Sequence, residues 1–249
     1  MKTSFWLISF IAFEAFKITY FFSINCLFEI RSYSYGRGYI YSCLTTDIPE
    51  STGSYVTEVT GEHLEGRNNY FVRFVEIDGN KTLSLFPRNF SHFFPNLAGF
   101  YVTNTLIKTL YGDELNEYGK RLEFFSFGYS SLKEVSSNLF GQTPNVEVVS
   151  FYNNKISHVG KNLFKPLNVS QMWHLQFYLN NCEGGLANYD EIPDLITIIL
   201  NNCGYDDEFL ITTTTTPTTT TMRTTTERLY CLSYDRKLRK VVKKYRTNN

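Results

Sequence analysis

Five cysteines are the residues of this chain whose type and spacing most directly predict chemistry. Cys26 and Cys43 lie 17 residues apart, and Cys182 and Cys203 lie 21 residues apart. No CxxC or HxxxH motif occurs, and the four histidines are far apart in the sequence, which argues against a zinc site. Disulfide formation is therefore the chemistry that we expect. Of the three pairings that four cysteines allow, the simplest is the local one, Cys26 with Cys43 and Cys182 with Cys203.

The fifth cysteine, Cys231, is left over by this pairing. An odd cysteine in an exported protein is either a free thiol or a bridge between two chains, so a dimer through Cys231 is one interpretation. Each local bridge is expected to stabilise the fold by about 3 kcal/mol on the chain-entropy model.

Catalytic motifs are missing from the sequence. It contains no GxSxG, GxxxxGK[ST] or HExxH, and the acidic run from Asp206 to Glu208 lacks the spacing of a calcium loop. We therefore expect a protein that is not an enzyme and has no cofactor, no catalytic residue and no metal ligand. A secreted hydrolase stays open as an alternative, because a fold can bring together two glycosidase carboxylates that are distant in sequence.

The N-terminus predicts export. Lys2 precedes an apolar run from Phe5 to Phe13, which is typical of a secretory signal peptide, here taken as residues 1–23. The alternative is a membrane anchor over residues 4–23, but this would place Glu14 and Lys17 near the middle of the bilayer. We expect a secreted, extracellular protein.

A repeat dominates the middle of the chain. Five nine-residue segments have apolar residues at their first, fourth and sixth places and a small polar residue at the ninth; they begin at Val72, Leu97, Leu122, Val146 and Met172. The starts are 24 to 26 residues apart. Alternation of the fourth and sixth places predicts a short strand with one inward face. One unit alone could not bury that face, so the units must stack.

The template continues beyond the ninth place. Further apolar residues recur in three columns: Ile107, Leu132 and Ile156; Leu85, Leu110, Val135 and Val159; and Phe90, Leu115, Phe140 and Phe164. These residues are expected to turn the chain back over its own core. At the ninth place the amide of Asn154 is expected to satisfy backbone groups of a neighbouring unit.

This pattern, LxxLxLxxN followed by a variable half, resembles the leucine-rich repeat family over residues 72–182. The stretch GEHLEGRNN (61–69) resembles an element, GxHxxG followed by asparagine, that precedes the first repeat in short secreted leucine-rich repeat proteins of insects. The resemblance implies an α/β solenoid: a short horseshoe with a parallel sheet on its concave face and disulfide-linked caps. The sequence departs from the family pattern where Val, Phe or Met replaces leucine and where Thr105 and Ser130 occupy the ninth place.

The remaining segments complete the predicted organisation. We expect an N-terminal cap at 24–71, with a hairpin around Gly36 and Gly38, the repeats at 72–182, a C-terminal cap at 183–211, a mucin-like linker at 212–226 and a basic tail at 227–249. Twelve of the fifteen linker residues are threonine, which predicts an O-glycosylated stalk or a bare flexible linker.

The tail carries the charge asymmetry of a chain whose formal net charge is zero. Residues 227–249 hold eight basic and two acidic residues, a net charge of +6, which leaves the remainder at −6. A solvated tail is one interpretation. The other is a basic amphipathic helix over residues 234–245 that contacts an anionic membrane surface or glycan. No nucleic-acid partner is expected.

Aromatic residues at the outward places of the predicted strands are the candidate binding site. They are Tyr101, Phe124, Tyr129, Tyr152, Trp173 and Tyr178. Aromatic side chains offer a large contact area at low entropic cost, although such a row could also pack on itself or under a cap. We expect a non-enzymatic protein that binds an extracellular protein or glycan, in immune recognition or receptor modulation. The alternative is a structural protein of the extracellular matrix.

Three NxS/T sequons are present, at Asn80, Asn89 and Asn168. Asn80 occupies a ninth place and is expected to turn inward, so it should be poorly glycosylated. Asn89 and Asn168 lie in the variable half of their units and are expected to carry glycans.

Overall fold

The computed structural model describes residues 21–33, 38–47, 54–79 and 82–207. The predicted signal peptide up to residue 20, Asn80, the threonine-rich linker, Cys231 and the basic tail all lie outside the described residues. Within the described ranges, no helix has the length and apolar character needed to cross a membrane.

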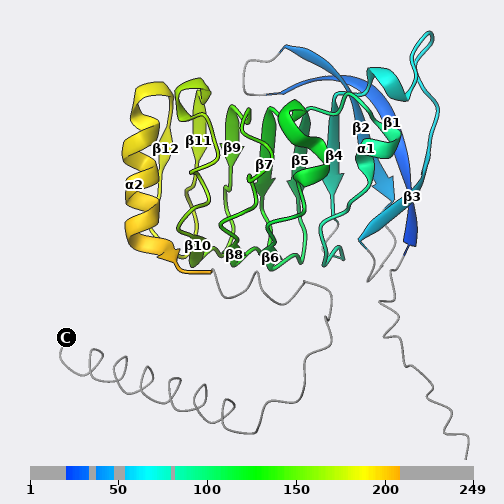
Figure 1. Ribbon diagram of the computed structural model, residues 1–249. Helices are drawn as coiled ribbons and strands as arrows, with labels where there is room; N and C mark the ends of the chain where they lie inside the picture. Colours follow the sequence, from blue (N-terminus) through cyan, green and yellow to red (C-terminus); the bar gives the residue numbers. More distant parts are fainter. Residues whose placement is uncertain (1–20, 34–37, 48–53, 80–81, 208–249) are drawn as a thin grey trace, which may run out of the picture. The chain divides into compact units, whose positions relative to one another are not determined.

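The described chain is an α/β fold built on a mostly parallel sheet (Figure 1). Its strands in sheet order are β12 (Leu186–Ala187), β11 (His174–Gln176), β9 (Val148–Ser150), β7 (Phe124–Gly128), β5 (Gly99–Thr103), β4 (Phe74–Asp78), β2 (Tyr39–Asp47), β1 (Phe21–Ser32) and β3 (Tyr55–Thr60). Neighbours from β2 to β11 pair in parallel, whereas β1 with β2 and β11 with β12 are antiparallel.

A second, shorter parallel sheet receives the chain after β5, β7 and β9, and again after α2. Its order is β13 (Gly204–Tyr205), β10 (His158–Gly160), β8 (Glu134–Val135) and β6 (Thr109–Leu110). Short helical segments make the return path: η1 (Asn69–Phe71), α1 (Phe90–Phe93), η2 (Asn116–Arg121), η3 (Val169–Gln171) and η4 (Tyr189–Glu191). The three units that begin at Leu97, Leu122 and Val146 therefore contribute one strand to each sheet.

The main core lies between the two sheets, and the sequence template predicts it well. All fifteen residues at the first, fourth and sixth places of the five units are at most 2% exposed. They belong to one continuous apolar cluster with the later column residues, such as Ile156 and Val159. Parallel strands of consecutive units align these places in register, so each unit covers the apolar face of the next.

Leu85 is an exception to the predicted columns. It is 40% exposed, while Leu83 and Phe86 on either side are buried. The reason is local: the short sheet begins only at β6, in the following unit, so no strand of that sheet fixes the inward direction at Leu85.

Ninth-place side chains hydrogen-bond neighbouring units, as predicted for Asn154. Asn154 Nδ2 donates to the carbonyl oxygen of Phe127 at 2.7 Å. One unit later, Asn180 Nδ2 donates to the carbonyl oxygen of Phe151 at 2.7 Å. Ser130, also at a ninth place, acts as an acceptor: its hydroxyl accepts a hydrogen bond from the backbone amide of Thr105 at 2.9 Å. Each side chain satisfies a backbone group that the bend at the end of a strand would leave unpaired.

The two predicted disulfides are confirmed, one at each end of the sheet. Cys26 in β1 is bonded to Cys43 in β2, and the expected hairpin joins them. Cys182 is bonded to Cys203, the last residue of α2 (Ile192–Cys203), which packs Ile192, Leu195 and Ile199 onto the end of the core (Figure 1). The disulfides fit a protein of an oxidising compartment.

Beyond β13, Asp207 anchors the chain to an earlier unit. The residue is buried, and its carboxylate accepts from the Ser137 amide at 2.6 Å and from the hydroxyls of Ser136 and Ser137. The acidic run that contains Asp207 is therefore only partly solvated: Asp206 is exposed and pairs with Lys161 at 2.7 Å.

Glu114 is a second buried carboxyl group, beside the short sheet. Burial raises its pKa to about 8, although the nearby Arg88 cation and a hydrogen bond from the Tyr111 amide act in the opposite direction. The folded protein therefore holds a proton on Glu114 at pH values where an unfolded chain has released it.

Asn154→Ala should lower the free energy of unfolding by about 1 to 3 kcal/mol, because it leaves the Phe127 carbonyl without its buried donor. Urea denaturation of the oxidised protein measures this. The exposed neighbour variant, Lys155→Ala, is the control and should stay within about 0.5 kcal/mol of wild type. Equal stability of the two variants would contradict the role assigned to the ninth place.

Glu114→Gln should flatten the pH dependence of stability. The wild-type carboxyl is protonated in the folded state up to a pKa of about 8 but ionises near 4.5 when unfolded, so stability is present at low pH and falls as pH rises between these values. The slope is at most about 1.4 kcal/mol per pH unit. Urea unfolding at several pH values should show a smaller loss in Glu114→Gln than in the exposed control Glu65→Gln.

Candidate functional site

The candidate site is the face of the long sheet that is turned away from the main core, here called the outer face. Period two along each strand places alternate residues on it. In sheet register these residues are Phe74, Glu76, Tyr101, Phe124, Ser126, Val148, Ser150, His174 and Gln176.

One part of the outer face is a small second core, here called the aromatic patch. Tyr33, Phe74, Ala98, Phe124 and Val148 are buried in it, with Ile40, Tyr101 and Trp173 packed at its margin. The ring centroids of Tyr33 and Phe74 are 4.7 Å apart, and those of Phe74 and Phe124 are 5.0 Å apart. Tyr33 follows β1, so the N-terminal hairpin itself covers this part of the sheet.

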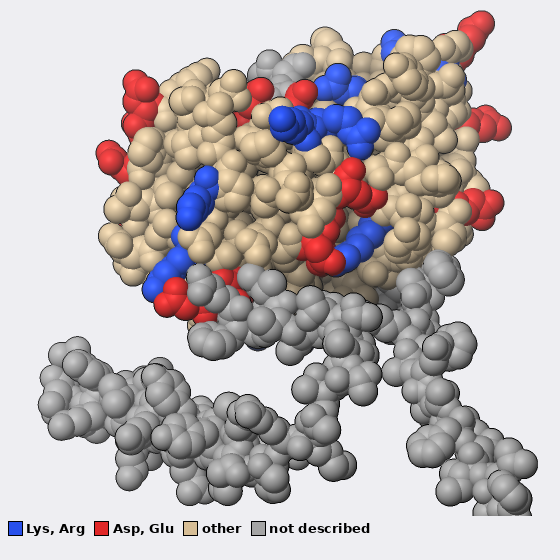
Figure 2. Space-filling view, in the orientation of Figure 1, with Lys and Arg blue, Asp and Glu red and all other residues tan. Residues whose placement is uncertain are grey.

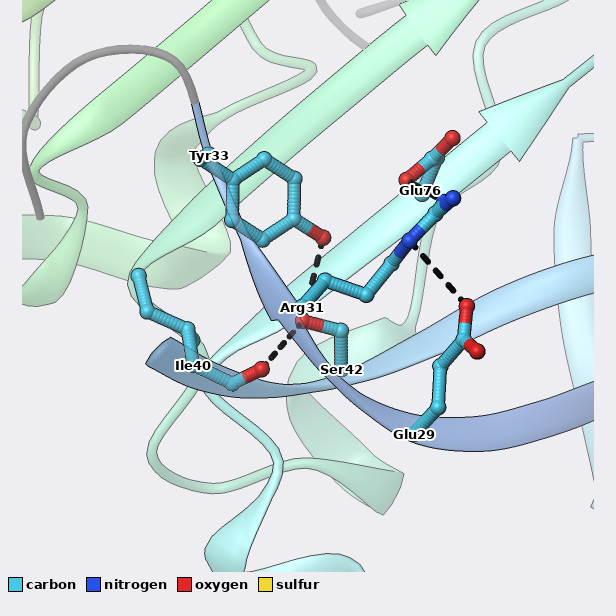
Figure 3. Close-up of polar contacts among 6 residues, drawn as sticks. All are labelled: Glu29, Arg31, Tyr33, Ile40, Ser42 and Glu76. Atoms are coloured by element: carbon cyan, nitrogen blue, oxygen red, sulfur yellow. Dashed lines mark hydrogen bonds and ion pairs between the residues drawn. The ribbon is translucent and has the colours of Figure 1, made fainter. Parts of the chain in front are cut away.

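Polar contacts hold the hairpin in this position (Figure 3). The Tyr33 hydroxyl donates to Ser42 Oγ at 3.0 Å, and Ser42 in turn donates to the Ile40 carbonyl at 3.1 Å. Arg31 Nε lies 3.1 Å from the Glu29 carboxylate, and Arg31 also forms an ion pair with Glu76 of β4.

The Tyr33 phenol is fixed in its protonated form. Burial raises its pKa to about 12, and the hydrogen bond to Ser42 opposes this only partly. Tyr33 therefore acts as a permanent hydrogen-bond donor within the aromatic patch, and not as a group that titrates near neutral pH.

A second group of aromatics lies at the surface where β7, β9 and β11 end. We call Tyr129, Tyr152 and Tyr178 the tyrosine ladder. Ring centroids of Tyr129 and Tyr152 are 5.0 Å apart, as are those of Tyr152 and Tyr178. Tyr129 is 51% exposed and Tyr178 is 42% exposed. Three amphipathic rings from consecutive units thus form one continuous surface.

Hydrogen bonds order this ladder. The Tyr129 amide donates to the Tyr152 carbonyl at 3.1 Å, and the Asn153 amide donates to the Tyr178 carbonyl at 3.0 Å. A hydrogen bond with Tyr129 raises the pKa of the Tyr152 phenol, and one with Tyr152 raises that of Tyr178. Both pKa values rise because a phenol proton that takes part in a hydrogen bond is harder to release. The backbone bonds therefore fix the strand ends that carry the rings, which lowers the entropy lost when a partner binds.

Small polar groups lie between the two aromatic areas. Ser126 and Ser150 are adjacent in register and buried, and Ser150 Oγ donates to Gln176 Oε1 at 2.9 Å. Of these three side chains, the half-buried Gln176 is the one that reaches the surface next to the tyrosine ladder.

The structure divides the six predicted binding residues. Tyr129, Tyr152 and Tyr178 come together as neighbours, of which Tyr129 and Tyr178 are exposed and Tyr152 is half-buried. Tyr101 and Trp173 are half-buried beside the aromatic patch, and Phe124 is fully buried within it, so Phe124 supports the site but offers no surface to a partner. Sequence reasoning missed Tyr33, because nothing in its local pattern shows which side of the sheet the hairpin covers.

Two sequons lie within the described residues, and their surroundings differ. Asn168 is exposed, and its Oδ1 accepts from the hydroxyl of Ser170 at 2.8 Å. Asn89 is half-buried, with a φ of 75°, and its Nδ2 donates to the Val56 carbonyl at 2.8 Å. The nitrogen that would carry a glycan is thus directed into the protein at Asn89.

Charges give no further indication of a site. On the face seen in Figure 2, basic and acidic side chains are interspersed in a mostly uncharged surface. Among the described residues, no group of three or more His, Cys, Asp or Glu side chains is placed to hold a metal ion.

Comparison with known proteins leaves the family open. No family model matches the chain, and no curated protein matches it.

We expect glycan occupancy to be high at Asn168 and lower at Asn89, where a sugar on Nδ2 must displace the contact with Val56. Glycopeptide mass spectrometry of the full chain expressed in insect cells measures both sites. High occupancy at Asn89 together with an unmodified Asn168 would contradict the positions assigned to these two side chains.

Proposed function

We propose that this protein is a secreted, non-enzymatic member of the leucine-rich repeat family that binds another extracellular protein through the tyrosine ladder. Support for the family comes from five units of 24 to 26 residues with buried first, fourth and sixth places. The parallel alignment of successive units in two sheets is the arrangement that such a solenoid requires. Secretion is supported by the two disulfides and by the apolar N-terminal run.

The observation that carries the binding proposal is a row of three tyrosines in edge-on and tilted contact at neighbouring strand ends, with the half-buried Tyr152 between the exposed Tyr129 and Tyr178. Ordinary packing does not account for them, since Tyr129 and Tyr178 keep half or nearly half of their surface in solvent. Tyrosine is enriched among the residues that contribute most to protein interfaces, because it combines large apolar area with a hydroxyl group.

A protein is the partner that this surface fits best. The ladder is a raised row of aromatics on the edge of a sheet and not an enclosed pocket, and the aromatic patch beside it is already covered by Tyr33. The half-buried Gln176 beside the ladder supplies a polar group for the rim of an interface.

Tyr129→Ala and Tyr152→Ala should each weaken binding of the partner by about 1 to 3 kcal/mol with little change in the free energy of unfolding. Tyr111→Ala is the matched control, because Tyr111 is exposed but follows β6 of the short sheet. The wild-type protein and all variants are used to capture proteins from extracellular fluid of the source organism. The affinity of a captured protein for each variant is then measured by titration. A partner that binds both ladder variants as tightly as Tyr111→Ala would place the interface elsewhere.

A further inference from the structure

A hollow of about 690 Å³ lies at the opposite edge of the long sheet from the tyrosine ladder, at the amino ends of β2 and β4. Tyr39, Tyr70 and Phe71 form its exposed aromatic walls, and Phe74 lies in its interior. Arg67 and Arg73 bring two guanidinium groups to it. The volume is in the range of small-ligand sites.

Arg67 is held in place by aromatic rings. Its guanidinium carbon lies 5.4 Å from the Tyr41 ring centroid and 5.2 Å from that of Phe71. Both rings are within cation–π distance, so they hold the Arg67 cation at the hollow. An aromatic cage that could have held a cationic ligand is here filled by the protein's own cation.

The loop GEHLEGRNN (61–69) builds this arrangement. The His63 ring stacks on Phe28 with centroids 3.8 Å apart, and its two nitrogens form hydrogen bonds of 2.9 Å with Tyr41 Oη and Asn69 Oδ1. Gly61 has a φ of 128°, and a Cβ there would lie 2.1 Å from the Cys26 carbonyl oxygen. The loop is thus fixed against the first disulfide, and it delivers Arg67 to the hollow from a rigid support.

The charge of the hollow is positive. Arg73 pairs with Glu123 at 3.2 Å, but no described carboxylate lies within ion-pair distance of Arg67. Glu65 lies two residues before Arg67 in the chain and does not line the hollow. Arg67 therefore has its fork of donors available for a carboxylate or sulfate, which it can bind in a bidentate manner.

We propose that this hollow binds an acidic saccharide, with Arg67 on the carboxylate or sulfate and the rings of Tyr39, Tyr70 and Phe71 against the sugar. The site is separate from the tyrosine ladder, so this proposal goes beyond the protein partner proposed above. The phenol groups and the Asn96 side chain that edge the hollow are polar partners for hydroxyl groups.

An extended peptide fits less well. Peptides are commonly recognised by adding a strand to a free sheet edge, whereas β2 is already paired with β1 on one side and β4 on the other. Backbone hydrogen bonds from this part of the sheet are therefore used, and the hollow offers side-chain contacts only.

Isothermal titration of the full chain with a sulfated heparin disaccharide tests the proposal. Binding should be weakened roughly tenfold or more by Arg67→Gln, and less by Arg67→Lys, which keeps the charge but loses the planar fork. Lys133→Gln is the matched control, because it removes an exposed positive charge from another surface. Tyr152→Ala should bind the disaccharide normally, which separates this site from the tyrosine ladder.

Two further ligands complete the experiment. The neutral disaccharide N,N′-diacetylchitobiose should bind at least roughly tenfold more weakly than the sulfated one, because it gives Arg67 no anion. Equal binding of the two saccharides, or equal losses in Arg67→Gln and Lys133→Gln, would overturn the proposal. A short tyrosine-sulfated peptide that binds more tightly than the disaccharide would also overturn it, and would make a sulfated protein the occupant.

Discussion

Each strand of the long sheet ends where the chain must turn away from the core, and the backbone groups at that bend need partners. In the later units the partner is a side-chain amide from the following unit, as in the bond from Asn154 to the Phe127 carbonyl and its repeat from Asn180 to Phe151. These bonds fix the spacing and direction of successive units, so that the apolar places of neighbouring strands meet in register. The continuous core therefore depends on a hydrogen-bond partner for the backbone groups at every bend.

A stack of units has two ends at which that core would be exposed, and the protein closes them in different ways. At one end α2 lays Ile192, Leu195 and Ile199 on the last unit, and Asp207 then ties the chain back to Ser137. At the other end a hairpin continues the sheet and also covers its outer face through Tyr33. The hairpin thereby covers the part of the outer face beside β4, β5 and β7, and the tyrosine ladder stands outside this covered part.

Sequence alone predicted the features that depend on a local period or on a short separation. The buried places of the five units, the amide of Asn154 and both disulfides belong to this class. Contacts between distant segments were not predictable in this way. Phe124 has the outward position of a binding residue, yet Tyr33 buries it, and the pairing of β13 with β10 follows only from the path of α2. The position of Arg67 beside Tyr41 and Phe71 was likewise not predictable, because nothing in the sequence of a polar loop indicates which rings its arginine contacts.

The short sequence separation of the disulfides has a consequence for biosynthesis. Cys43 follows Cys26 by 17 residues, whereas a further 139 residues separate Cys43 from Cys182. At ordinary rates of chain elongation this interval lasts about 7 to 30 seconds. During that time the first two thiols have no competitor, so the order of synthesis itself selects their pairing. The second pair then forms with the first already closed, and the chain reaches its native connectivity without having to sort four thiols at once.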